Sequence, residues 1–557
     1  MVIKHKLAKA LEQAARQAQQ EGLLAAAALP EILVERPQNP EHGDYASSLP
    51  LKLARTTEMA PPAIAEKIIE LMPPLPEVSR IVVASPGFIN FSLSTGWLTE
   101  QVAAILDAGD FYGNADIGAG KSVQIEFVSV NPTGPLHVGH GRGAVLGSTL
   151  ANVLGATGYN IEKEYYINDA GSQLDAFGRS LYARFQQCRG IDAEMPSDGY
   201  LGNYMIDLAK EIIGSKTDTN ALLSKKLKEG DIIKKIAVIG SQKVMDMIKR
   251  DLKTLGVEFD VWFSEQSLYK NGQFEKVMKS LTKGGYVAEK ENATWFISSA
   301  LGEDKDNVLI RSDGSPTYFA ADIAYHFNKF LERKFDTVID IWGADHQGHV
   351  SRMMAVVNAL GIDSKKLKIV ICQLVTLRRG QELVKVSKRS GDVITLKEVI
   401  DEVGPDACRF VFLSRSADAQ MDFDLELAKK QSADNPVYYV QYAHARISSI
   451  LRLAKEKGID YSRGDVSLLT TEPELTLIRQ MVRLPEIAEL ISETLEPHHL
   501  PYYAQDLATV FHSFYKQCRV VSKNQELTQA RLKLVKSAQI VLARTLHLMG
   551  MTAPESM

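Results

Sequence analysis

The chain has 557 residues, 45% of them hydrophobic and 24% charged, and its formal net charge at pH 7 is −4. This length predicts three or four domains, and the composition is that of a soluble globular protein. No apolar run is long enough to span a bilayer, so a transmembrane helix is excluded, and the small negative charge gives no indication of nucleic-acid binding by the chain as a whole.

The N-terminus and the cysteines favour the cytoplasm. The first 30 residues make a poor signal or transit peptide, because Glu12 and Glu21 interrupt a short apolar stretch. The four cysteines form no CxxC pair, so neither a zinc knuckle nor a disulfide framework is indicated. We therefore expect a cytoplasmic protein with no membrane partner.

The first segment, to about residue 110, is expected to be a small α+β domain. Residues 1–20 have the pattern of a helix. The stretch RIVVASPGFINFSLS alternates between apolar and polar residues, which predicts two strands around a turn at Pro86 and Gly87. The glycine-containing stretch AGDFYGNADIGAGK then predicts a linker.

From Ser122 the pattern becomes strand, loop and helix. VQIEFVSV reads as a buried strand, GAVLGSTLANVLGATG as a helix and NIEKEYYIND as a second strand, and such a βαβ unit predicts a parallel sheet. The pattern dissolves between about 190 and 300, which indicates an insertion. It returns with FDTVIDIWGADHQGH and with KIVICQLVTL, which reads as a further strand. After about residue 400 the apolar spacing is helical and predicts a bundle.

The stretch NPTGPLHVGHGRG, from Asn131 to Gly143, combines two prolines, four glycines and two histidines. A metal site could use His137 and His140, but no HExxH carboxylate follows and no cysteine is near. Nucleotidyl transfer is a second possibility, because glycines let the backbone approach a nucleotide and two imidazoles can donate hydrogen bonds to a phosphate. A glycine-rich turn with incidental histidines is the structural alternative.

A dinucleotide site is the remaining possibility for this stretch. Gly139, Gly141 and Ala144 satisfy GxGxxA after a strand, and Glu162 or Glu164 lies where a ribose-binding acid belongs. A lone match of this kind is weak, and it leaves both histidines unexplained.

A second motif favours nucleotidyl transfer. VKVSKRSGDVITL places Lys385 and Lys388 in a loop flanked by serine and glycine, and lysine ammonium groups suit polyphosphate. HxGH together with KxSK resembles the signature of class I aminoacyl-tRNA synthetases.

The resemblance to arginyl-tRNA synthetases extends over the whole chain, in nine stretches that occur in the order of that family. They are HGDYASSLPLKLA, SPGFINF, VNPTGPLHVGHGRGAVLG, EYYINDAG, PTYFAADIAYH, GADHQGH, KVSKRSGD, NPVYYVQYAHAR and GMTAPESM. The second motif departs from the wider class, with Val386 where methionine is usual and Arg389 where serine is usual. Both lysines remain, so the resemblance implies that the phosphate role is kept.

The resemblance implies a multidomain α/β fold. The expected domains are an N-terminal tRNA-contacting α+β domain (1–110), a Rossmann-type class I synthetase catalytic domain (111–375, with the insertion at about 190–300), a region with the KVSKR loop and a connecting stem-contact segment (376–430), and a C-terminal all-α anticodon-binding bundle (431–557).

The resemblance also assigns site residues. The catalytic residues would be His137, His140, Lys385 and Lys388. ATP would be bound by these four together with Gly139, Gly343, Asp345 and Ser387, although Asp345 could instead be a helix N-cap. Arginine would be bound by Glu126, Ser129, Asn131, Tyr318, Asp322 and either His346 or Gln347, between which the sequence does not decide.

Physical reasoning supports an acidic pocket for arginine. A guanidinium group is planar and always charged, and a carboxylate holds it best in bidentate geometry. Tyr318 and Asp322 are four residues apart, so they share one helical face. Without the resemblance, a surface helix pair would be the preferred interpretation.

For tRNA, the resemblance implies contacts from Phe88, Asn90, Tyr439, Tyr442 and Met557. Exposed aromatic rings stack on unpaired bases. By spacing alone Tyr439 and Tyr442 are more typical of a core, and Phe88 could simply be buried.

The implied activity is that of an ATP-dependent arginine–tRNA ligase. L-Arginine would react with ATP to give arginyl-adenylate and pyrophosphate, and the arginyl group would pass to the 3′ end of tRNA(Arg). Mg²⁺ would be bound mainly through the ATP phosphates, with no protein metal site. Similar enzymes are mostly monomeric and need tRNA before they activate the amino acid. The alternatives are another HxGH nucleotidyltransferase, such as a cytidylyltransferase, a synthetase of this class with a different amino-acid specificity, a non-catalytic tRNA-binding relative and a metal hydrolase.

Overall fold

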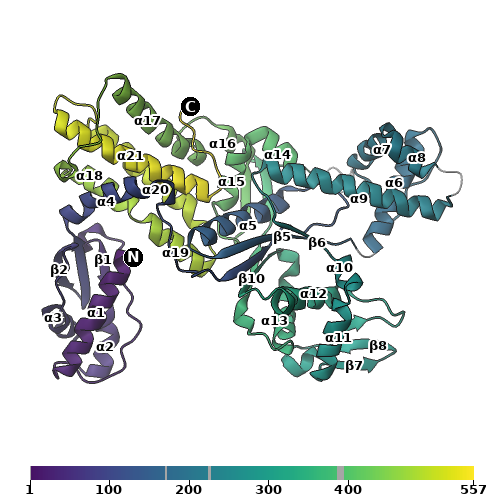
Figure 1. Cartoon of the computed structure of the whole chain (residues 1–557), viewed down its shortest axis with the longest axis horizontal. Coiled ribbons are helices and arrows are strands. Elements are labelled where there is room, and N and C mark those ends of the chain that lie inside the picture. Colours follow the sequence, from purple (N-terminus) through teal and green to yellow (C-terminus); the bar gives the residue numbers. More distant parts are fainter. Residues whose placement is uncertain (1, 170–171, 224–226, 385–393) are drawn as a thin grey trace.

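The computed structural model describes residues 2–169, 172–223, 227–384 and 394–557. Its elements gather in separate lobes around a central parallel sheet, with the N-terminal domain and the C-terminal helices at one end and a helical arm at the other (Figure 1). Across the described part of the chain, no helix combines the length and hydrophobicity that crossing a membrane requires.

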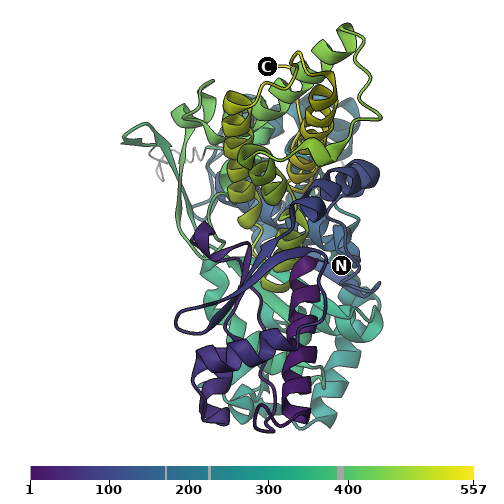
Figure 2. The same cartoon turned by 90° about the vertical axis from the view of Figure 1, so that its left-hand side faces the viewer.

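The N-terminal domain is the predicted α+β unit. Its antiparallel sheet has the order β1-β3-β2, and Ala84 pairs with Phe88 across the predicted Pro86–Gly87 turn. The elements are α1 (Ile3–Gln20), β1 (Tyr45–Ser47), α2 (Leu49–Thr57), α3 (Pro61–Glu70), β2 (Val78–Ala84) and β3 (Phe88–Leu93). The domain lies beneath the C-terminal helices in both views (Figure 2), and Arg36 reaches across to Glu486 with an Nε–Oε2 distance of 2.8 Å.

The central sheet contains five parallel strands in the order β11-β10-β4-β5-β6. They are β11 (Leu367–Cys372), β10 (Thr337–Gly343), β4 (Ser122–Glu126), β5 (Asn160–Ile167) and β6 (Val261–Ser264). The strand order reverses between β4 and β10. In open parallel sheets, ligands bind beyond the carboxyl ends of the strands at such a point.

Helices cover both faces of this sheet, as expected for parallel strands. On one face, α5 (Val138–Ala156) contacts β4, β5 and β10 and in turn packs against α15 (Pro405–Leu413) and α19 (Leu484–Thr494). On the other face, α12 (Tyr318–Phe327) and α13 (Val350–Ala359) share a second hydrophobic core with β10.

The segment between about 190 and 300 is more than an added lobe. Together with α6 (Ser172–Cys188), which precedes it in the chain, its first part forms the helical arm through α7 (Tyr204–Gly214), α8 (Lys216–Leu222) and α9 (Glu229–Thr254). The chain then returns to the sheet as its edge strand β6 before it forms α10 (Gln266–Lys270), α11 (Gln273–Lys283) and the antiparallel sheet β7-β8-β9 (Val287–Lys290, Ala293–Phe296, Asn307–Ile310). The four residues of β6 are too few for a periodic pattern to reveal.

The single strand predicted for KIVICQLVTL is wrong. The stretch divides into β11, in the central sheet, and β12 (Val375–Arg379), in a small sheet of order β13-β12-β14 with β13 (Glu382–Leu383) and β14 (Met421–Asp424). The break occurs at Gln373, whose carbonyl accepts a hydrogen bond of 2.8 Å from Arg142 and whose N–H donates to Ala417 at 2.8 Å. These long-range contacts were not readable from apolar periodicity.

The C-terminal region is helical, as predicted. After α14 (Leu396–Val403), α15 and α16 (Leu425–Lys429), the bundle consists of α17 (Pro436–Glu456), α18 (Glu472–Met481), α19, α20 (His499–Gln517) and α21 (Gln525–Leu548). Helix α4 (Thr95–Ala108), which follows the N-terminal domain, packs against α18 and α21.

Candidate active site

The turn after β4 has an unusual backbone. Val128 and Ser129 have φ angles of +70° and +44°, in the left-handed region that β-branched residues rarely occupy. The hydroxyl of Tyr165 donates to the Val130 carbonyl at 2.8 Å and accepts from its N–H at 3.0 Å, while Ser129 Oγ accepts from the N–H of Tyr166 at 3.1 Å. Strand β5 therefore holds this turn in place and aims the following residues across the carboxyl end of the sheet.

The two histidines of the HVGH motif form the first turn of α5, which begins at Val138 rather than after the glycines. His137 is the N-cap, and its Nδ1 accepts a hydrogen bond of 3.2 Å from the N–H of Gly139. The N–H of His137 in turn donates to Nδ1 of His140 at 3.2 Å. The imidazole side chains thus replace the aspartate or serine that usually caps a helix.

Both imidazoles are neutral. Burial lowers the pKa of His140 to about 3, with a further contribution from His137, and burial also lowers the pKa of His137. Because each Nδ1 accepts a backbone hydrogen bond, the proton of each ring is on Nε2. The helix N-terminus therefore presents two N–H donors of uncharged rings toward an anion.

A cavity of about 970 Å³ lies beside these histidines. One wall is the segment from Val130 to His140, and the opposite wall is formed by residues 199–207 at the start of α7. Thr395 and Glu398 complete it. The N–H of Leu396 donates to the Leu136 carbonyl at 2.7 Å, so the start of α14 is joined directly to the HVGH segment. Lys385, Ser387 and Lys388 lie just before this junction in the sequence, outside the described residues.

Acidic side chains from three elements face one another beyond the strand ends. The pKa of Asp322, on α12, is raised to about 7, mainly by burial and also by the carboxylate of Glu126 at the end of β4. Burial likewise raises the pKa of Glu265, directly after β6, to about 7, against a hydrogen bond with Tyr166 that lowers it, while Asp322 and Asp169 raise it. Carboxyl groups whose pKa values are raised toward 7 by burial and mutual repulsion indicate a site for a cation.

Glu265 was not among the predicted site residues. It follows VWFS, and a strand assignment for these four residues would have placed Glu265 at a carboxyl strand end, where ligands bind. Lys329 was also missed. It lies in the π-helical segment Asn328–Glu332 and its Nζ is 2.6 Å from Glu126 Oε2.

The other predicted arginine-binding residues lie around this cluster. Tyr318 is the first residue of α12 and is 46% exposed, one turn before Asp322, as predicted from their spacing. Asn131 donates from its Nδ2 to Gln173. His346 and Gln347 are both exposed in the 3₁₀ helix Ala344–His349, which follows β10, so the choice between them stays open.

The contacts exclude two interpretations that the sequence left open, an N-cap role for Asp345 and a ribose-binding role for Glu164. Asp345 is not an N-cap, because Gly343 occupies that position and the Asp345 carboxylate, 82% exposed, lies 3.5 Å from His346 Nε2. Glu164 cannot serve as the ribose-binding acid of a dinucleotide site, because its carboxylate is buried and lies 2.6 Å from Arg333 NH2. Glu162 pairs with the same guanidinium group.

The two tyrosines predicted to contact tRNA are half-buried on α17. Tyr439 and Tyr442 pack against His512 of α20, with ring centroids 4.8 and 5.9 Å apart. Arg446 donates to the Tyr442 hydroxyl. Met557 is 55% exposed, and it lines a hollow together with Tyr438 of α17.

The N-terminal residues predicted to contact tRNA differ in their exposure. Phe88 is half-buried at the start of β3. Asn90 is only 3% exposed, with its Nδ2 3.4 Å from His42 Nδ1. A direct contact of Asn90 with tRNA stays a prediction that requires its side chain to become exposed.

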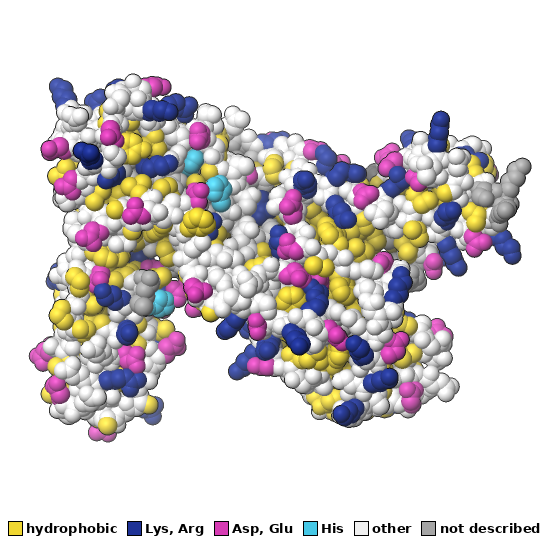
Figure 3. Space-filling model, viewed as in Figure 1, with side chains coloured by type: hydrophobic (Ala, Val, Ile, Leu, Met, Phe, Trp, Pro, Cys, Tyr) yellow, Lys and Arg dark blue, Asp and Glu magenta, His cyan; other side chains and the backbone are white. Residues whose placement is uncertain are grey.

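On the face of the molecule drawn in Figure 3, the charged side chains do not single out one binding surface. Figure 3 shows lysine and arginine side chains spread over the lobes on this side of the molecule, with acidic side chains between them. On this face, a phosphate-binding surface has to be inferred from local geometry.

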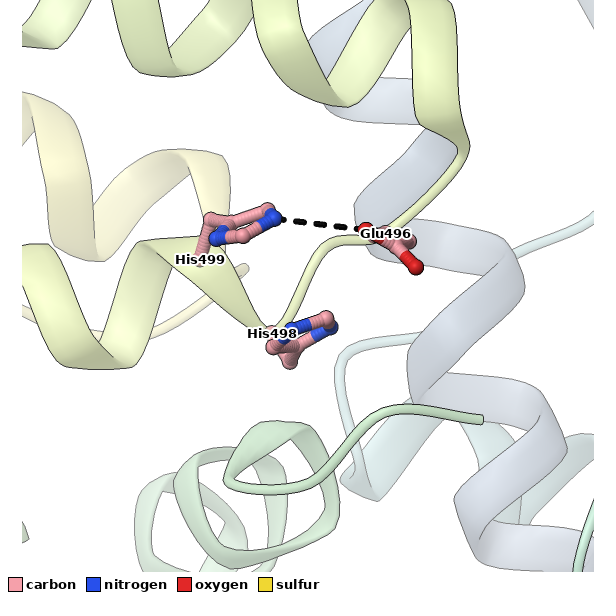
Figure 4. A group of neighbouring side chains, drawn as sticks. All are labelled: Glu496, His498 and His499. Carbon is pink, nitrogen blue, oxygen red and sulfur yellow. Dashed lines mark hydrogen bonds and ion pairs between the residues drawn. The ribbon is translucent and has the colours of Figure 1, made fainter. Parts of the chain in front are cut away.

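A separate group of side chains that could ligate a metal lies where the chain enters α20. Glu496, His498 and His499 each place one ligand atom within 4.8 Å of the others (Figure 4). The Glu496 carboxylate is 49% exposed and contacts His499 Nε2 at 3.4 Å. None of the three lines the cavity beside the HVGH segment, so this group is distinct from the candidate active site.

Three known family models together cover nearly the whole chain. Residues 1–93 match the arginyl tRNA synthetase N terminal domain, residues 101–448 match the tRNA synthetases class I (R) catalytic domain, and residues 440–557 match the DALR anticodon binding domain. The arginine–tRNA ligase of Dehalococcoides mccartyi strain CBDB1 is 58% identical over 557 residues, covering 100% of this chain and 99% of the relative.

More distant proteins show the same similarity to arginyl-tRNA synthetases. The arginine–tRNA ligase of Heliobacterium modesticaldum is 47% identical over 562 residues, covering 100% of this chain and 99% of that relative. The solved structure of Thermus thermophilus arginyl-tRNA synthetase has the same fold, with a TM-score of 0.76 at 23% identity, covering 99% of this chain and 100% of that one. The chain belongs to the arginyl-tRNA synthetase family.

Proposed function

We propose that this chain is an arginine–tRNA ligase, which uses ATP to activate L-arginine and then transfers it to the 3′ end of tRNA(Arg). The observation that carries the proposal is the buried acid cluster of Glu126, Asp322 and Glu265 at the same end of the sheet as the neutral pair His137 and His140. A synthetase for another amino acid or a different HxGH nucleotidyltransferase is not favoured, because relatives with 58% and 47% identity over the full length are named arginine–tRNA ligase.

The acid cluster supplies the specificity. Asp322 and Glu265 would accept hydrogen bonds from the guanidinium group, and the Tyr318 hydroxyl would bind beside them, with His346 or Gln347 closing the pocket. Glu126 would share the guanidinium end with these two acids, and Ser129 and Asn131 would hold the α-amino and carboxylate end. Lysine, a compact ammonium group, would leave one acid unpaired, and unpaired buried polar groups make discrimination steep, about 10⁴-fold in favourable sites.

ATP would lie across the N-terminus of α5. The Nε2–H groups of His137 and His140 would donate to the α-phosphate oxygens, Gly139 allows close approach, and the helix dipole adds to the attraction. Gly343 and Asp345, after β10, would meet the ribose. Lys385, Ser387 and Lys388 would supply positive charge to the polyphosphate.

Mg²⁺ would arrive with ATP. The carboxylates that line the cavity are Asp207 and Glu398, and Glu398 already accepts hydrogen bonds from Thr395 at the start of α14. The described residues therefore offer no multi-carboxylate cage there, which fits an ion held mainly through phosphates. Bound in this way, it would neutralise charge on the departing pyrophosphate.

Two displacements complete the reaction. An arginine carboxylate oxygen attacks the α-phosphorus, the α–β phosphoanhydride bond breaks, and pyrophosphate leaves. A ribose hydroxyl of the terminal tRNA adenosine then attacks the arginyl carbonyl, and AMP leaves with the bond electrons. The His137 and His140 donors stabilise the phosphorus-centred transition state without forming a covalent intermediate.

The remaining parts would bind tRNA. The DALR bundle would receive the anticodon, with Tyr439, Tyr442 and Met557 near it, and the N-terminal domain would contact tRNA through Phe88 and Asn90. The region 376–430 would contact the stem. The enzyme would act as a cytoplasmic monomer.

Arginine-dependent exchange of pyrophosphate into ATP, measured with and without tRNA(Arg), tests the proposal. We expect exchange with arginine only, and a strong dependence on tRNA. Preference for another amino acid would refute the pocket assignment. Replacement of Lys388 by alanine should slow exchange much more than it weakens tRNA binding, and equal effects on both would contradict its phosphate role.

A further inference from the structure

Glu496, His498 and His499 lie within four consecutive residues where the chain enters α20. Each places one ligand atom within 4.8 Å of the others (Figure 4). His499 Nε2 lies 3.4 Å from Glu496 Oε2, and the centroids of the two imidazole rings are 4.4 Å apart. Two imidazoles and a carboxylate form a donor set that Zn²⁺ accepts, whereas Mg²⁺ and Ca²⁺ prefer oxygen ligands alone. This donor set therefore favours a transition metal of the zinc type.

His498 has a ring nitrogen that the folded chain does not use. Its Nδ1 is buried and has no hydrogen-bond partner among the residues that the structure describes. Buried polar atoms without a partner are rare, because each loses its hydrogen bonds to water and gains none in return. A metal ion bound to Nδ1 through the lone pair of the neutral imidazole would remove this deficit. The unpaired nitrogen points to a ligand independently of the clustering.

The backbone of this segment keeps the three side chains together. The Pro497 carbonyl accepts a hydrogen bond of 3.1 Å from the N–H of Leu500, and both residues are buried. The Glu496 carbonyl accepts from the N–H of His499 at 3.4 Å. Ligand atoms around a tetrahedral Zn²⁺ ion lie roughly 3.4 Å apart, so the side chains have to close by about 1.4 Å at most. The Glu496 side chain, 49% exposed, can make this movement.

A second carboxylate comes from the loop between α15 and β14. Burial and the neighbouring His499 lower the pKa of His498, whereas the carboxylates of Glu496 and Asp418 raise it. Asp418 is therefore close enough to interact with the His498 ring, and it is exposed, so its carboxylate can turn toward an ion held there. The N-terminus of α20 opposes a bound cation, and the two carboxylates offset this effect.

We propose that Glu496, His498 and His499 form a binding site for a divalent transition metal of the zinc type, with Asp418 as the fourth ligand. The ligands would come from two parts of the fold, the entrance to α20 in the C-terminal bundle and the loop before β14. Four protein ligands leave no open position for a substrate, so the ion would be structural. It would be distinct from the Mg²⁺ that accompanies ATP.

The loop that carries Asp418 contacts both domains. On one side, the hydroxyl of Tyr502, one turn beyond His498 on α20, donates to the Ser414 carbonyl at 2.8 Å. On the other side, the guanidinium group of Arg142, on α5, donates to two further carbonyls of the loop at 2.7 and 2.9 Å. An ion that joins Asp418 to His498 would therefore fasten the bundle to the loop held by the HVGH helix. Such an ion binds the folded chain alone and should stabilise it.

The first experiment titrates the full-length chain, freed of metal by dialysis against EDTA, with Zn²⁺ in a calorimeter. We expect one site per chain, which Glu496→Gln and His499→Ala weaken at least about 100-fold, because loss of even an outer-shell partner of a metal ligand costs about 10- to 100-fold in affinity. Asp418→Asn should weaken binding about 10- to 100-fold. His547→Ala, at an exposed histidine of α21, is the matched control and should bind Zn²⁺ like the wild type.

Thermal unfolding and an optical probe locate the ion. At a free Zn²⁺ concentration 100 times the Kd, the unfolding equilibrium of the wild type should shift about 100-fold toward the folded chain, and Mg²⁺ at the same concentration should not cause this shift. In EDTA the wild type, Glu496→Gln and His499→Ala should melt at the same temperature, because an exposed ion pair contributes little. Co²⁺ in place of Zn²⁺ should give the intense visible absorption of a four-coordinate ion, and His499→Ala should lose it.

The outcomes are distinct. If the wild type binds no Zn²⁺, or if Glu496→Gln and His499→Ala bind it as tightly as the wild type, the proposed site is wrong. Wild-type affinity in Asp418→Asn would refute the fourth ligand and with it the link to the catalytic domain. None of these results depends on the proposed function, because pyrophosphate exchange tests the amino-acid specificity separately.

Discussion

The imidazole rings of His137 and His140 stack with their centroids 3.4 Å apart, and each ring accepts a backbone hydrogen bond from the same helical turn. Two adjacent imidazolium ions would repel each other in this arrangement, and a helix N-terminus would repel both. The motif therefore provides donors without charge. In a class I site of this kind, positive charge for the polyphosphate must come from elsewhere, which is the role we propose for Lys385 and Lys388.

Neutral histidines predict that these two rings add nothing to the pH dependence of kcat between pH 8 and 6. The folded pKa of His140, about 3, lies far below the ordinary value, so lowering the pH from 8 to 6 should neither protonate the ring nor accelerate exchange. His140→Ala should reduce kcat for pyrophosphate exchange by about 10²- to 10³-fold, the usual cost of one transition-state donor, with little change in the arginine KM. Steady-state kinetics and imidazole chemical shifts measured against pH check both points.

The stability should respond to pH through the same ring. An unfolded chain binds a proton on His140 below its ordinary pKa, whereas the folded protein does not until about pH 3, so this ring lowers stability as the pH falls through that window. His140→Ala should reduce the loss of melting temperature between pH 6.5 and 5. His499→Ala, at the start of α20, is the control and should preserve kcat. An imidazole shift that titrates near pH 6.5 would contradict the neutral assignment.

Arginine binding should release protons. The pKa values of Asp322 and Glu265 are about 7 in the free protein, so at pH 6.5 both are largely protonated. A guanidinium group binds the ionised forms, and arginine affinity should therefore fall as the pH drops below 7. Calorimetric titration at pH 6.5 in two buffers of different ionisation enthalpy should give different binding enthalpies, with the difference reduced in Asp322→Asn.

Asp322→Asn should also separate stability from function. Because the folded pKa of Asp322 is raised, the folded protein holds this proton more tightly than the unfolded chain, and stability declines as the pH rises through about 7. At pH 8 the variant should melt at a higher temperature than the wild type while binding arginine much more weakly. A lower melting temperature at pH 8, or buffer-independent enthalpies, would show that these acids are ionised without ligand.

The aromatic face of α17 predicts a selective loss of tRNA affinity. If Tyr442 stacks on an unpaired base, Tyr442→Ala should raise the KM for tRNA about 5- to 100-fold, because one base stack is worth about 1–3 kcal/mol. Tyr442→Phe keeps the ring against His512 but loses the hydrogen bond with Arg446, so it should cost about five-fold at most. Aminoacylation kinetics at varied tRNA concentration distinguish the two, and equal effects of both substitutions would contradict stacking.

Some of the site was readable because its signals are local. The strand–loop–helix pattern around His137 lies within about 40 residues, and the spacing of Tyr318 and Asp322 fixes a shared helical face. The turn at Pro86 is likewise a local signal. In each case neighbours in the sequence are also neighbours in space, so periodicity and turn residues suffice.

The rest depends on contacts between distant segments. Lys329 and Glu126 are separated by 203 residues, and a lysine near the charged residues 332–334 reads as a solvated charge. Glu265 follows a four-residue strand that pairs with β5, from which the whole helical arm separates it in the sequence. Such residues can be recognised as site residues only in the folded structure, where tertiary packing brings their elements to one sheet edge.

Gly147 in α5 offers a test of how the HVGH helix is held on the sheet. A Cβ at this position would lie 2.3 Å from Cγ of Phe127, a fully buried ring directly after β4, so the close approach of helix and strand requires glycine here. Gly147→Ala should destabilise the fold by about 1–3 kcal/mol despite the better helix propensity of alanine, because the ring and backbone must shift. The same shift displaces His137 and His140, so kcat should fall as well.

Gly143→Ala is the matched control in the same helix, since nothing lies within 4 Å of its Cβ, and it should leave stability unchanged or raise it by up to about 1 kcal/mol. Urea unfolding of the two variants compares them directly, and equal stabilities would mean that α5 does not depend on this contact for its position on β4.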